Sequence, residues 1–426
     1  MKNFLLKFKL ISIALLSLAF IHVHGTTEGD SLSMGPTYAD DIYYSFENGE
    51  VSKAARDTWD IAFYTQRFSS GILINEGNTV ELYTYPNGDT SAWNTIDTTG
   101  MSTNWKKMYN SKEYFEVGAF SINALGHPDY GWGVYNTVNH SVYGDSLFII
   151  VTPSGIKKIR IDVKISLDNI YHFTYADLDG SNEQSVELDV VPYESKQFVY
   201  YSLANNKVVD REPAKESWDI LFTKYFDEFR PGGGDPVPQL VTGVNNNIGV
   251  YSNNFYPVDP TFNNWASADF DSAKNAIGYD WKFFDFGSFS FIVTDSNYYF
   301  VKTVNGDIYK LKFKTWEGSS TGIFTFDKWL VSLSDVDELI TANDAFVVYP
   351  NPSANGSITI KTPATLAGDF SIQIIDQSGR KIYRKTFSNS QLRNGAKLTD
   401  IELPSGFYLI FVTGNNYAES QKLIVR

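Results

Sequence analysis

Two histidines, His140 and His172, stand near the two ends of the stretch 131–175, and histidine is a residue type that can carry chemistry. The only other histidine after residue 25, His127, lies in a Gly-His-Pro segment and is interpreted as a turn residue. The chain contains no cysteine, which excludes thiolate chemistry and cysteine-based metal sites. The stretch that contains His140 and His172 is therefore the part of the chain on which the question of function depends.

Three strand-like segments, separated by turn residues, position these histidines. From residue 156 to 165, isoleucine and valine alternate with charged residues, which predicts a half-buried strand. The predicted inward residues are Ile159, Ile161, Val163 and Ile165, and the predicted outward residues are Lys158, Arg160, Asp162 and Lys164.

The last of these segments contains His172. Tyr171, Phe173 and Tyr175 share one face of the predicted strand, because successive strand residues point to opposite faces. His172 and Thr174 share the other face. His172 is therefore expected to face a ligand or solvent.

The composition favours an all-β protein. The chain has 426 residues, which suggests about two or three domains. Apolar residues make up 43% and aromatic residues 16% of the chain, and no long segment places apolar residues at helical spacing. The formal charge of −14 argues against nucleic-acid binding, which needs clustered lysine and arginine.

The first 25 residues have the pattern of a signal peptide. Lys2, Lys7 and Lys9 precede an apolar run from residue 10 to 23, and we predict cleavage near Gly25. The run is short for a membrane span of ~20 residues, and no later stretch qualifies as a transmembrane segment. Without cysteine there is neither a lipoprotein anchor nor a disulfide. We therefore predict residues 1–25 as a signal peptide and expect a protein that is secreted or held at the outer cell surface.

An internal duplication divides the body of the chain. Tyr-Tyr-Ser at 43–45 leads to Trp-Asp-Ile-Ala-Phe at 59–63. The same order recurs at 200–202 and 218–222, with leucine in place of alanine. In each copy, the alternation predicts that the tryptophan is in the core and that the aspartate can bind backbone amides.

The duplication sets the predicted domain boundaries. We predict a first unit over residues 26–190 and a second unit over residues 191–333. A short, polar, acidic linker is predicted over residues 334–346. The last domain is predicted over residues 347–426, where the composition changes.

Residues 347–426 predict a small β-sandwich of about seven short strands. They resemble the C-terminal sorting domain of proteins exported by the type IX secretion system, with YPNP at 349–352, a D-x-x-G-R turn at 376–380, LPSGFY at 403–408 and a basic C-terminus. The resemblance implies an immunoglobulin-like fold, export across the outer membrane and the type IX secretion machinery as a partner. An ordinary immunoglobulin-like module is the alternative.

The Trp-Asp-Ile-Ala-Phe segment and the stretch 131–175 resemble the HmuY family of secreted haem-binding proteins, in two tandem and divergent copies. The resemblance implies an all-β fold that holds haem iron between two histidines, here His140 and His172. Two axial imidazoles favour holding haem over activating oxygen, so a binding protein for iron acquisition, and not an enzyme, is expected. The resemblance further implies an outer-membrane haem receptor as a partner. Residues 74–80 depart from the family, which has a glycine- and serine-rich run at this place.

A porphyrin needs apolar walls and cations for its propionates. The predicted walls are the residues that flank His140, namely Trp132, Tyr135, Val138 and Tyr143, and the predicted cations are Lys157, Lys158 or Arg160. From residue 191 onward the chain has no histidine, methionine or cysteine. At most one histidine-ligated haem per chain is therefore expected.

Other readings remain open. A non-catalytic surface binding or adhesion module would use the aromatic faces of the two units without haem. Gly-Asp-Ser-Leu at 144–147 matches an esterase motif but precedes a strand where that chemistry needs a helix, and no Asp-x-x-His follows. Asp177–Gly180 lacks the full calcium-loop spacing, which favours a hairpin turn. Paired carboxylates of a glycosidase cannot be recognised by spacing alone.

Overall fold

The computed structural model describes residues 28–230, 233–332, 346–353, 357–362, 368–376, 381–398, 401, 403–414 and 417–426. Regular structure in these residues is almost entirely β-strand, which confirms the predicted all-β class. The two α-helices found there, α1 (Met101–Asn104) and α2 (Asn389–Arg393), are short. The predicted signal peptide and residues 334–345 of the predicted linker lie outside the described residues.

The first unit is built from two sheets that share one core. The larger sheet has the order β13-β12-β11-β10-β6-β7, and β9 pairs with both β11 and β8. Its strands are β6 (Glu81–Thr84), β7 (Lys107–Met108), β8 (Gly133–Tyr135), β9 (Ser141–Gly144), β10 (Phe148–Thr152), β11 (Gly155–Ile165), β12 (Ile170–Asp177) and β13 (Gln184–Asp189). The smaller sheet has the order β15-β14-β4-β5, with β4 (Ile61–Tyr64), β5 (Ile72–Ile74), β14 (Phe198–Ser202) and β15 (Lys207–Val209).

The second unit has the same two-sheet plan around its own core. One sheet has the order β1-β23-β22-β21-β18, with β1 (Glu28–Ser33), β18 (Tyr251–Phe255), β21 (Tyr298–Lys302), β22 (Ile308–Trp316) and β23 (Ile323–Ser332). The other has the order β17-β16-β2-β3, with β2 (Asp40–Ser45), β3 (Gly49–Ala55), β16 (Ile220–Phe229) and β17 (Val237–Asn246). A separate hairpin consists of β19 (Lys282–Asp285) and β20 (Ser290–Val293).

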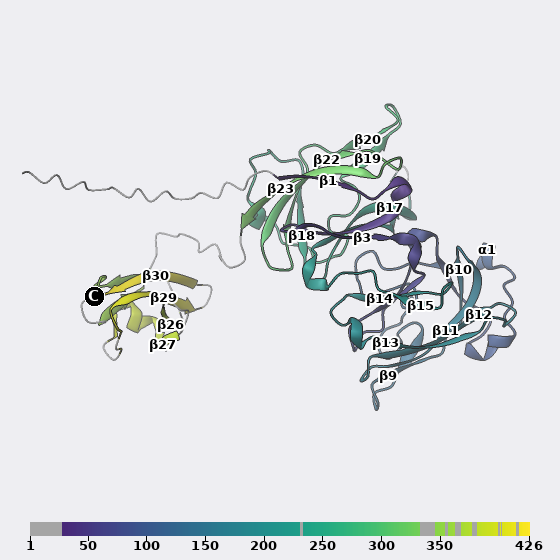
Figure 1. The fold of residues 1–426 in the computed structure, drawn as a ribbon, viewed down its shortest axis with the longest axis horizontal. Coiled ribbons are helices and arrows are strands. Elements are labelled where there is room, and N and C mark those ends of the chain that lie inside the picture. Colours follow the sequence, from purple (N-terminus) through teal and green to yellow (C-terminus); the bar gives the residue numbers. More distant parts are fainter. Residues whose placement is uncertain are drawn as a thin grey trace, which may run out of the picture.

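Strands from before the predicted boundary at residues 190 and 191 pair with strands from after it, and this occurs in both units. Strand β2 pairs with β16, so the first Tyr-Tyr-Ser segment completes the second unit. Strand β14 pairs with β4, so the second Tyr-Tyr-Ser segment completes the first unit. Figure 1 shows the consequence, since the purple strands β1 and β3 lie among the teal and green strands of the second unit. We therefore use "first unit" and "second unit" for these two-sheet bodies and not for the predicted ranges.

The two aspartates of the repeated motif bind backbone amides across this exchange, as predicted. Asp60 accepts a hydrogen bond from the backbone N–H of Leu203 at 2.7 Å. Asp219 accepts the equivalent bond from Phe46 at 2.8 Å and another from Val304 at 3.0 Å. These bonds fix the chain that follows each Tyr-Tyr-Ser strand.

The alternation predicted for strand β11 is wrong at its C-terminal end. The register between β11 and β12 shifts between Ile161 and Val163. Such a bulge inserts one extra residue and reverses which side chains face the core. Lys164 is therefore buried, and its ammonium group donates to the carbonyl oxygens of Gln66 and Ser69. Burial lowers the pKa of Lys164 to about 7.

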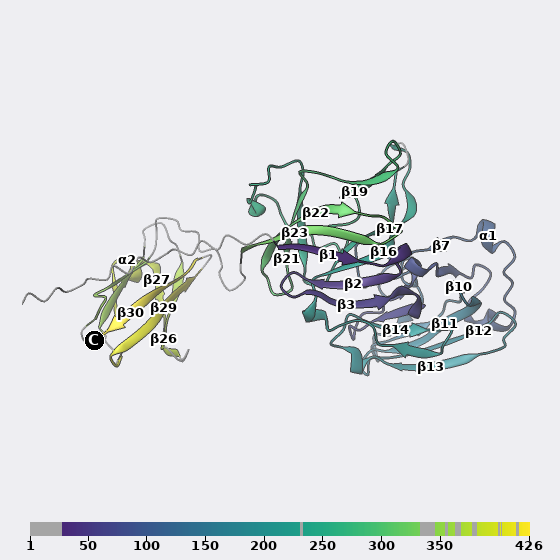
Figure 2. The same ribbon diagram turned by 45° about the horizontal axis from the view of Figure 1, so that its top comes forward.

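The described residues between 346 and 426 form a separate sandwich with its own core. Its two sheets have the orders β24-β25-β28 and β27-β26-β29-β30, so seven strands are found in these described residues, as expected. Figure 2 labels most of them. The strands are β24 (Val347–Tyr349), β25 (Ile358–Lys361), β26 (Asp369–Asp376), β27 (Lys381–Ser388), β28 (Ala396–Leu398), β29 (Gly406–Gly414) and β30 (Tyr417–Val425).

Candidate functional site

His140 lies exposed in the turn that connects strands β8 and β9, with a backbone φ of 57°. Its Nδ1 is 2.6 Å from the hydroxyl of Tyr135, and the ring of Phe68 lies 6.5 Å away, edge to face. Histidines that bind metal commonly use one ring nitrogen while the other is held by a hydrogen bond. The contact with Tyr135 leaves Nε2 as the nitrogen free for a ligand.

His127 belongs to the same cluster, although the sequence indicated only a turn residue. Its ring lies 5.3 Å from the ring of Tyr135, which in turn lies 6.1 Å from the ring of His140. Tyr130 is a further neighbour of Tyr135, at 6.0 Å. The Gly-His-Pro sequence alone could not predict this proximity, because it depends on how the loop before β8 folds back toward Tyr135.

His172 lies in strand β12 and is about one-third exposed. Its neighbours along the strand, Tyr171 and Phe173, are completely buried in the core of the first unit, so His172 points to the opposite face, as expected. Its Nε2 is 4.0 Å from a carboxylate oxygen of Glu187 on β13. Val163 and Tyr143 lie in the same row of the sheet.

No hydrogen bond, ion pair or ring contact joins His140 and His172 in the part of the chain that the structure describes. Tyr135, which contacts His140, packs against the core of the first unit and pairs with the buried Val142. His172 projects from the other face of that sheet, away from the buried Tyr171 and Phe173. No group of three or more histidine and carboxylate side chains in the described residues is arranged to hold a metal ion. That His140 and His172 ligate one haem iron remains a prediction from the sequence.

The predicted walls and cations are only partly available to a ligand. Tyr135 is partly exposed, but Trp132 is fully buried and donates its indole N–H to the carbonyl of Ser70 at 2.9 Å, so it is a core residue here. The predicted propionate cations are already paired. Lys157 contacts Asp177 at 2.8 Å, Lys158 donates to the carbonyl of Trp93 at 2.7 Å, and Arg160 contacts Asp162 at 2.7 Å.

Two hollows lie elsewhere, where the first and second units meet. A cleft of about 400 Å³ is lined by residues 106–113, by Ile122 and Asn123, and by residues of β16 and β17. In it, the rings of Tyr109 and Phe226 lie 4.6 Å apart, and the ammonium group of Lys107 lies 5.2 Å from the Phe226 ring. Neither this cleft nor the second hollow contains a histidine.

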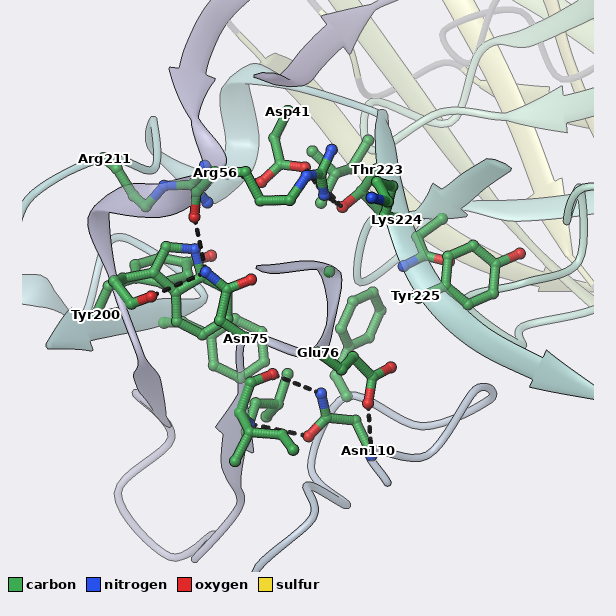
Figure 3. A pocket seen from close by; sticks show the side chains of 18 of the residues that line it. Asp41, Arg56, Asn75, Glu76, Asn110, Tyr200, Arg211, Thr223, Lys224 and Tyr225 are labelled. Carbon is green, nitrogen blue, oxygen red and sulfur yellow. Dashed lines mark hydrogen bonds and ion pairs between the residues drawn. The ribbon is translucent and has the colours of Figure 1, made fainter. Parts of the chain in front are cut away.

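The second hollow, of about 90 Å³, contains a buried ion-pair cluster (Figure 3). Asp41 contacts Arg56 at 2.6 Å and Arg211 at 2.8 Å, and it accepts a hydrogen bond from Thr223 at 2.7 Å. Burial raises the pKa of Asp41, but the two guanidinium groups and the hydroxyl outweigh burial, so the pKa lies below its ordinary value. This cluster keeps Asp41 ionised in the interior.

The hairpin β19–β20 of the second unit presents exposed aromatic side chains. Phe286 and Phe289 are each 79% exposed, and Phe283 is 52% exposed. Phe289 has a positive φ of 51°, like His140 in the corresponding hairpin of the first unit. The position that carries an imidazole in one hairpin therefore carries a phenyl ring in the other.

Comparisons with known proteins identify two parts of the chain. Residues 194–327 match the family model described as HmuY protein, and residues 347–426 match that of the secretion system C-terminal sorting domain. The HmuY match does not include His140 or His172. Among curated proteins, no match was found. None of the helices in the described part of the chain has the length and hydropathy of a membrane span.

One solved structure with a match is that of dimeric latent PorU from Porphyromonas gingivalis. The match has 12% sequence identity and a TM-score of 0.15, and it covers 84% of this chain and 31% of that chain. The chain thus corresponds to about a third of the PorU length, and a score this low supports no argument about fold. The two family matches are specific, and they show that the chain is a secreted, cell-surface protein with an HmuY family domain over residues 194–327 and a type IX secretion sorting domain over residues 347–426.

Proposed function

We propose that this protein binds haem at the cell surface through His140 of the first unit. The HmuY resemblance supports haem as the ligand, and the sorting domain supports a location where haem can be captured outside the cell. The observation that carries the proposal is the 2.6 Å contact between Tyr135 and Nδ1 of His140, which orients the exposed imidazole with Nε2 available.

Haem would supply an iron that accepts an imidazole nitrogen and an apolar disc that packs on aromatic rings. In this chain, His140 is the proposed iron ligand, Tyr135 the positioning residue, and Phe68 an exposed apolar neighbour. That His172 supplies the second axial ligand remains a prediction from the sequence.

Titration of the purified protein with hemin, followed by absorbance, tests the proposal. The expected result is a shifted Soret band that saturates at one haem per chain and is lost in His140→Ala. The variant His172→Ala tests whether His172 is the second axial ligand. If this variant still binds hemin but loses the low-spin spectrum of the wild type, both histidines ligate the iron. Unchanged binding in His140→Ala would refute the proposed site.

A surface binding module without haem is the second candidate, and the exposed hairpin β19–β20 favours it. Its phenylalanines form an apolar surface of a kind that soluble proteins usually reserve for binding. This function predicts binding to a protein or glycan that survives His140→Ala but is lost when Phe286 and Phe289 are both replaced by serine.

A further inference from the structure

The hollow of about 90 Å³ in Figure 3 is partly open and has charged and polar side chains in its wall, and the haem proposal does not use it. It lies where the turn η3 (Glu76–Asn78) packs against strand β16, so both units contribute to its wall. One water molecule needs ~10–15 Å³ of such space. The hollow therefore has room for a small molecule of several non-hydrogen atoms.

Its wall carries buried polar atoms that have no hydrogen-bond partner among the described residues. Two of these are donors, Nε1 of Trp59 and Nε of Arg211, and one, the Oδ1 atom of Asn245, is an acceptor. The hydroxyl of Tyr225 is also buried without a partner, but it points away from the hollow (Figure 3), toward Gly278. Buried polar groups nearly always have a hydrogen-bond partner. Several unpartnered polar atoms around one hollow therefore indicate a bound molecule that forms hydrogen bonds with them.

The charge on the wall is positive. Its cations are Arg56, Arg211, Lys224 and Lys274, and its carboxylates are Asp41 and Glu76. Asp41 is shared by both arginines, and Glu76 already accepts hydrogen bonds from the backbone of Asn110 and Phe226.

Lys274 is the cation with the least compensation. It is 5% exposed, and its ammonium group makes no hydrogen bond or ion pair with any residue that the structure describes. Burial lowers its pKa to about 8, although Glu76 and Asp227 partly oppose the shift. Glu76 and Asp227 act on it only from a distance, since no carboxylate of the described residues forms an ion pair with it, and a buried ammonium group without a direct partner is costly. This cost favours an anion beside it.

We propose that this hollow binds a small oxyanion of up to about five non-hydrogen atoms, such as acetate, bicarbonate or phosphate. The ammonium group of Lys274 supplies the charge, and the free N–H groups of Arg211 and Trp59 donate to the oxygens. Asn245 accepts from a water or from a protonated oxygen of the ligand. Because both units form the wall, the anion strengthens their junction.

Thermal unfolding of the mature full-length protein in acetate, bicarbonate or phosphate tests the proposal, with chloride as the reference at equal ionic strength and pH. At least one of these anions is expected to raise the Tm in a saturable way. Lys274→Met should abolish that rise. Lys302→Met, which removes an exposed lysine of β21, is the matched control for net charge and should retain it.

Trp59→Phe, which removes the indole N–H, is a second variant that keeps the test valid if Lys274→Met does not fold. Isothermal titration with the most effective anion should show a Kd at least tenfold larger for Lys274→Met and at least threefold larger for Trp59→Phe. If none of the three anions changes the Tm of the wild type, the hollow holds ordered water only and the proposal is overturned. A rise that persists in the folded variants would place the anion elsewhere and would also overturn it.

Discussion

The hydroxyl groups of Tyr43 and Tyr200 lie 3.3 Å apart at the buried junction of the two units, although 157 residues separate them. The predicted repeat places these tyrosines at equivalent positions. Each also packs edge-on against the tryptophan of the other copy, with ring centroids at 5.1 Å for Tyr43 and Trp218 and at 4.9 Å for Tyr200 and Trp59. Each unit therefore contains strands from both copies of the sequence repeat, since β2 pairs with β16 and β14 pairs with β4.

This exchange predicts that both units unfold in one cooperative transition. Asp60→Ala removes the acceptor of the Leu203 N–H and should lower the free energy of unfolding by about 1–3 kcal/mol, because it leaves a buried donor unpaired. Urea unfolding followed by tryptophan fluorescence and far-UV circular dichroism would show one shifted transition. Asp57→Ala, at an exposed position, should change stability by less than about 0.5 kcal/mol. Two separate transitions, only one of them shifted, would contradict the exchange.

Asp41 is expected to be among the most sensitive positions of the junction. Asp41→Asn leaves Arg56 and Arg211 buried without their carboxylate, which should cost about 3–5 kcal/mol. Asp295→Asn removes an ion pair with Lys312 in which the aspartate is 85% exposed, and it should leave the stability almost unchanged because exposed ion pairs are screened by water. Chemical denaturation of both variants at pH 7 measures the difference, and equal losses would show that the Asp41 cluster adds little.

Glu212 predicts a pH dependence of stability. It is buried and accepts hydrogen bonds from the backbone of Gln197 and Phe198 and from the hydroxyl of Tyr200. Burial raises its pKa to about 7, although these bonds and Arg211 oppose the shift. Between pH ~4.5 and 7 the folded state holds a proton that the unfolded chain releases, so this group makes the protein less stable as pH rises through that window.

The contribution of Glu212 can be isolated in a variant. Glu212→Gln cannot ionise, so the fall of about 3 kcal/mol expected of Glu212 over that window should disappear from its stability profile. Urea unfolding of both proteins at pH 4.5, 5.5, 6.5 and 7.5 provides the comparison. If the two profiles remain parallel, Glu212 titrates at its ordinary pKa.

Tyr135 is expected to position the His140 ring. Tyr135→Phe keeps the aromatic ring and removes only the hydroxyl that contacts Nδ1, so hemin affinity should fall about tenfold while the spectrum of the complex keeps its type. Tyr143→Phe is the control, because the hydroxyl of Tyr143 accepts a hydrogen bond from Asn139 and does not contact His140. Equal affinity of the two variants would show that the Tyr135 contact does not matter for binding.

The sequence predicted the strands well where the alternation was regular. In β12, Tyr171, Phe173 and Tyr175 are all buried, as their spacing required. In β11, the bulge after Ile161 cannot be recognised in the amino-acid sequence, because the extra residue, Asp162, itself fits an alternating pattern. The burial of Lys164 therefore could not be predicted and is known only from the structure.

The site was harder to predict than the strands, because its geometry depends on turns and long-range contacts. A spacing of 32 residues between His140 and His172 says nothing about which face of the sheet each ring occupies. The positive φ of His140, which places it in the turn after β8, and its contact with Tyr135 are visible only in the structure. The proximity of His127 to the same tyrosine, and the exchange of strands between the two units, depend on how distant segments pack.

The most direct test of the proposed haem binding is the dissociation constant for hemin of the wild type, His140→Ala and His127→Ala, measured under one set of conditions. The account predicts one haem per chain in the wild type, at least a hundredfold loss of affinity in His140→Ala, and at most a modest change in His127→Ala. Equal affinity of the wild type and His140→Ala would contradict it.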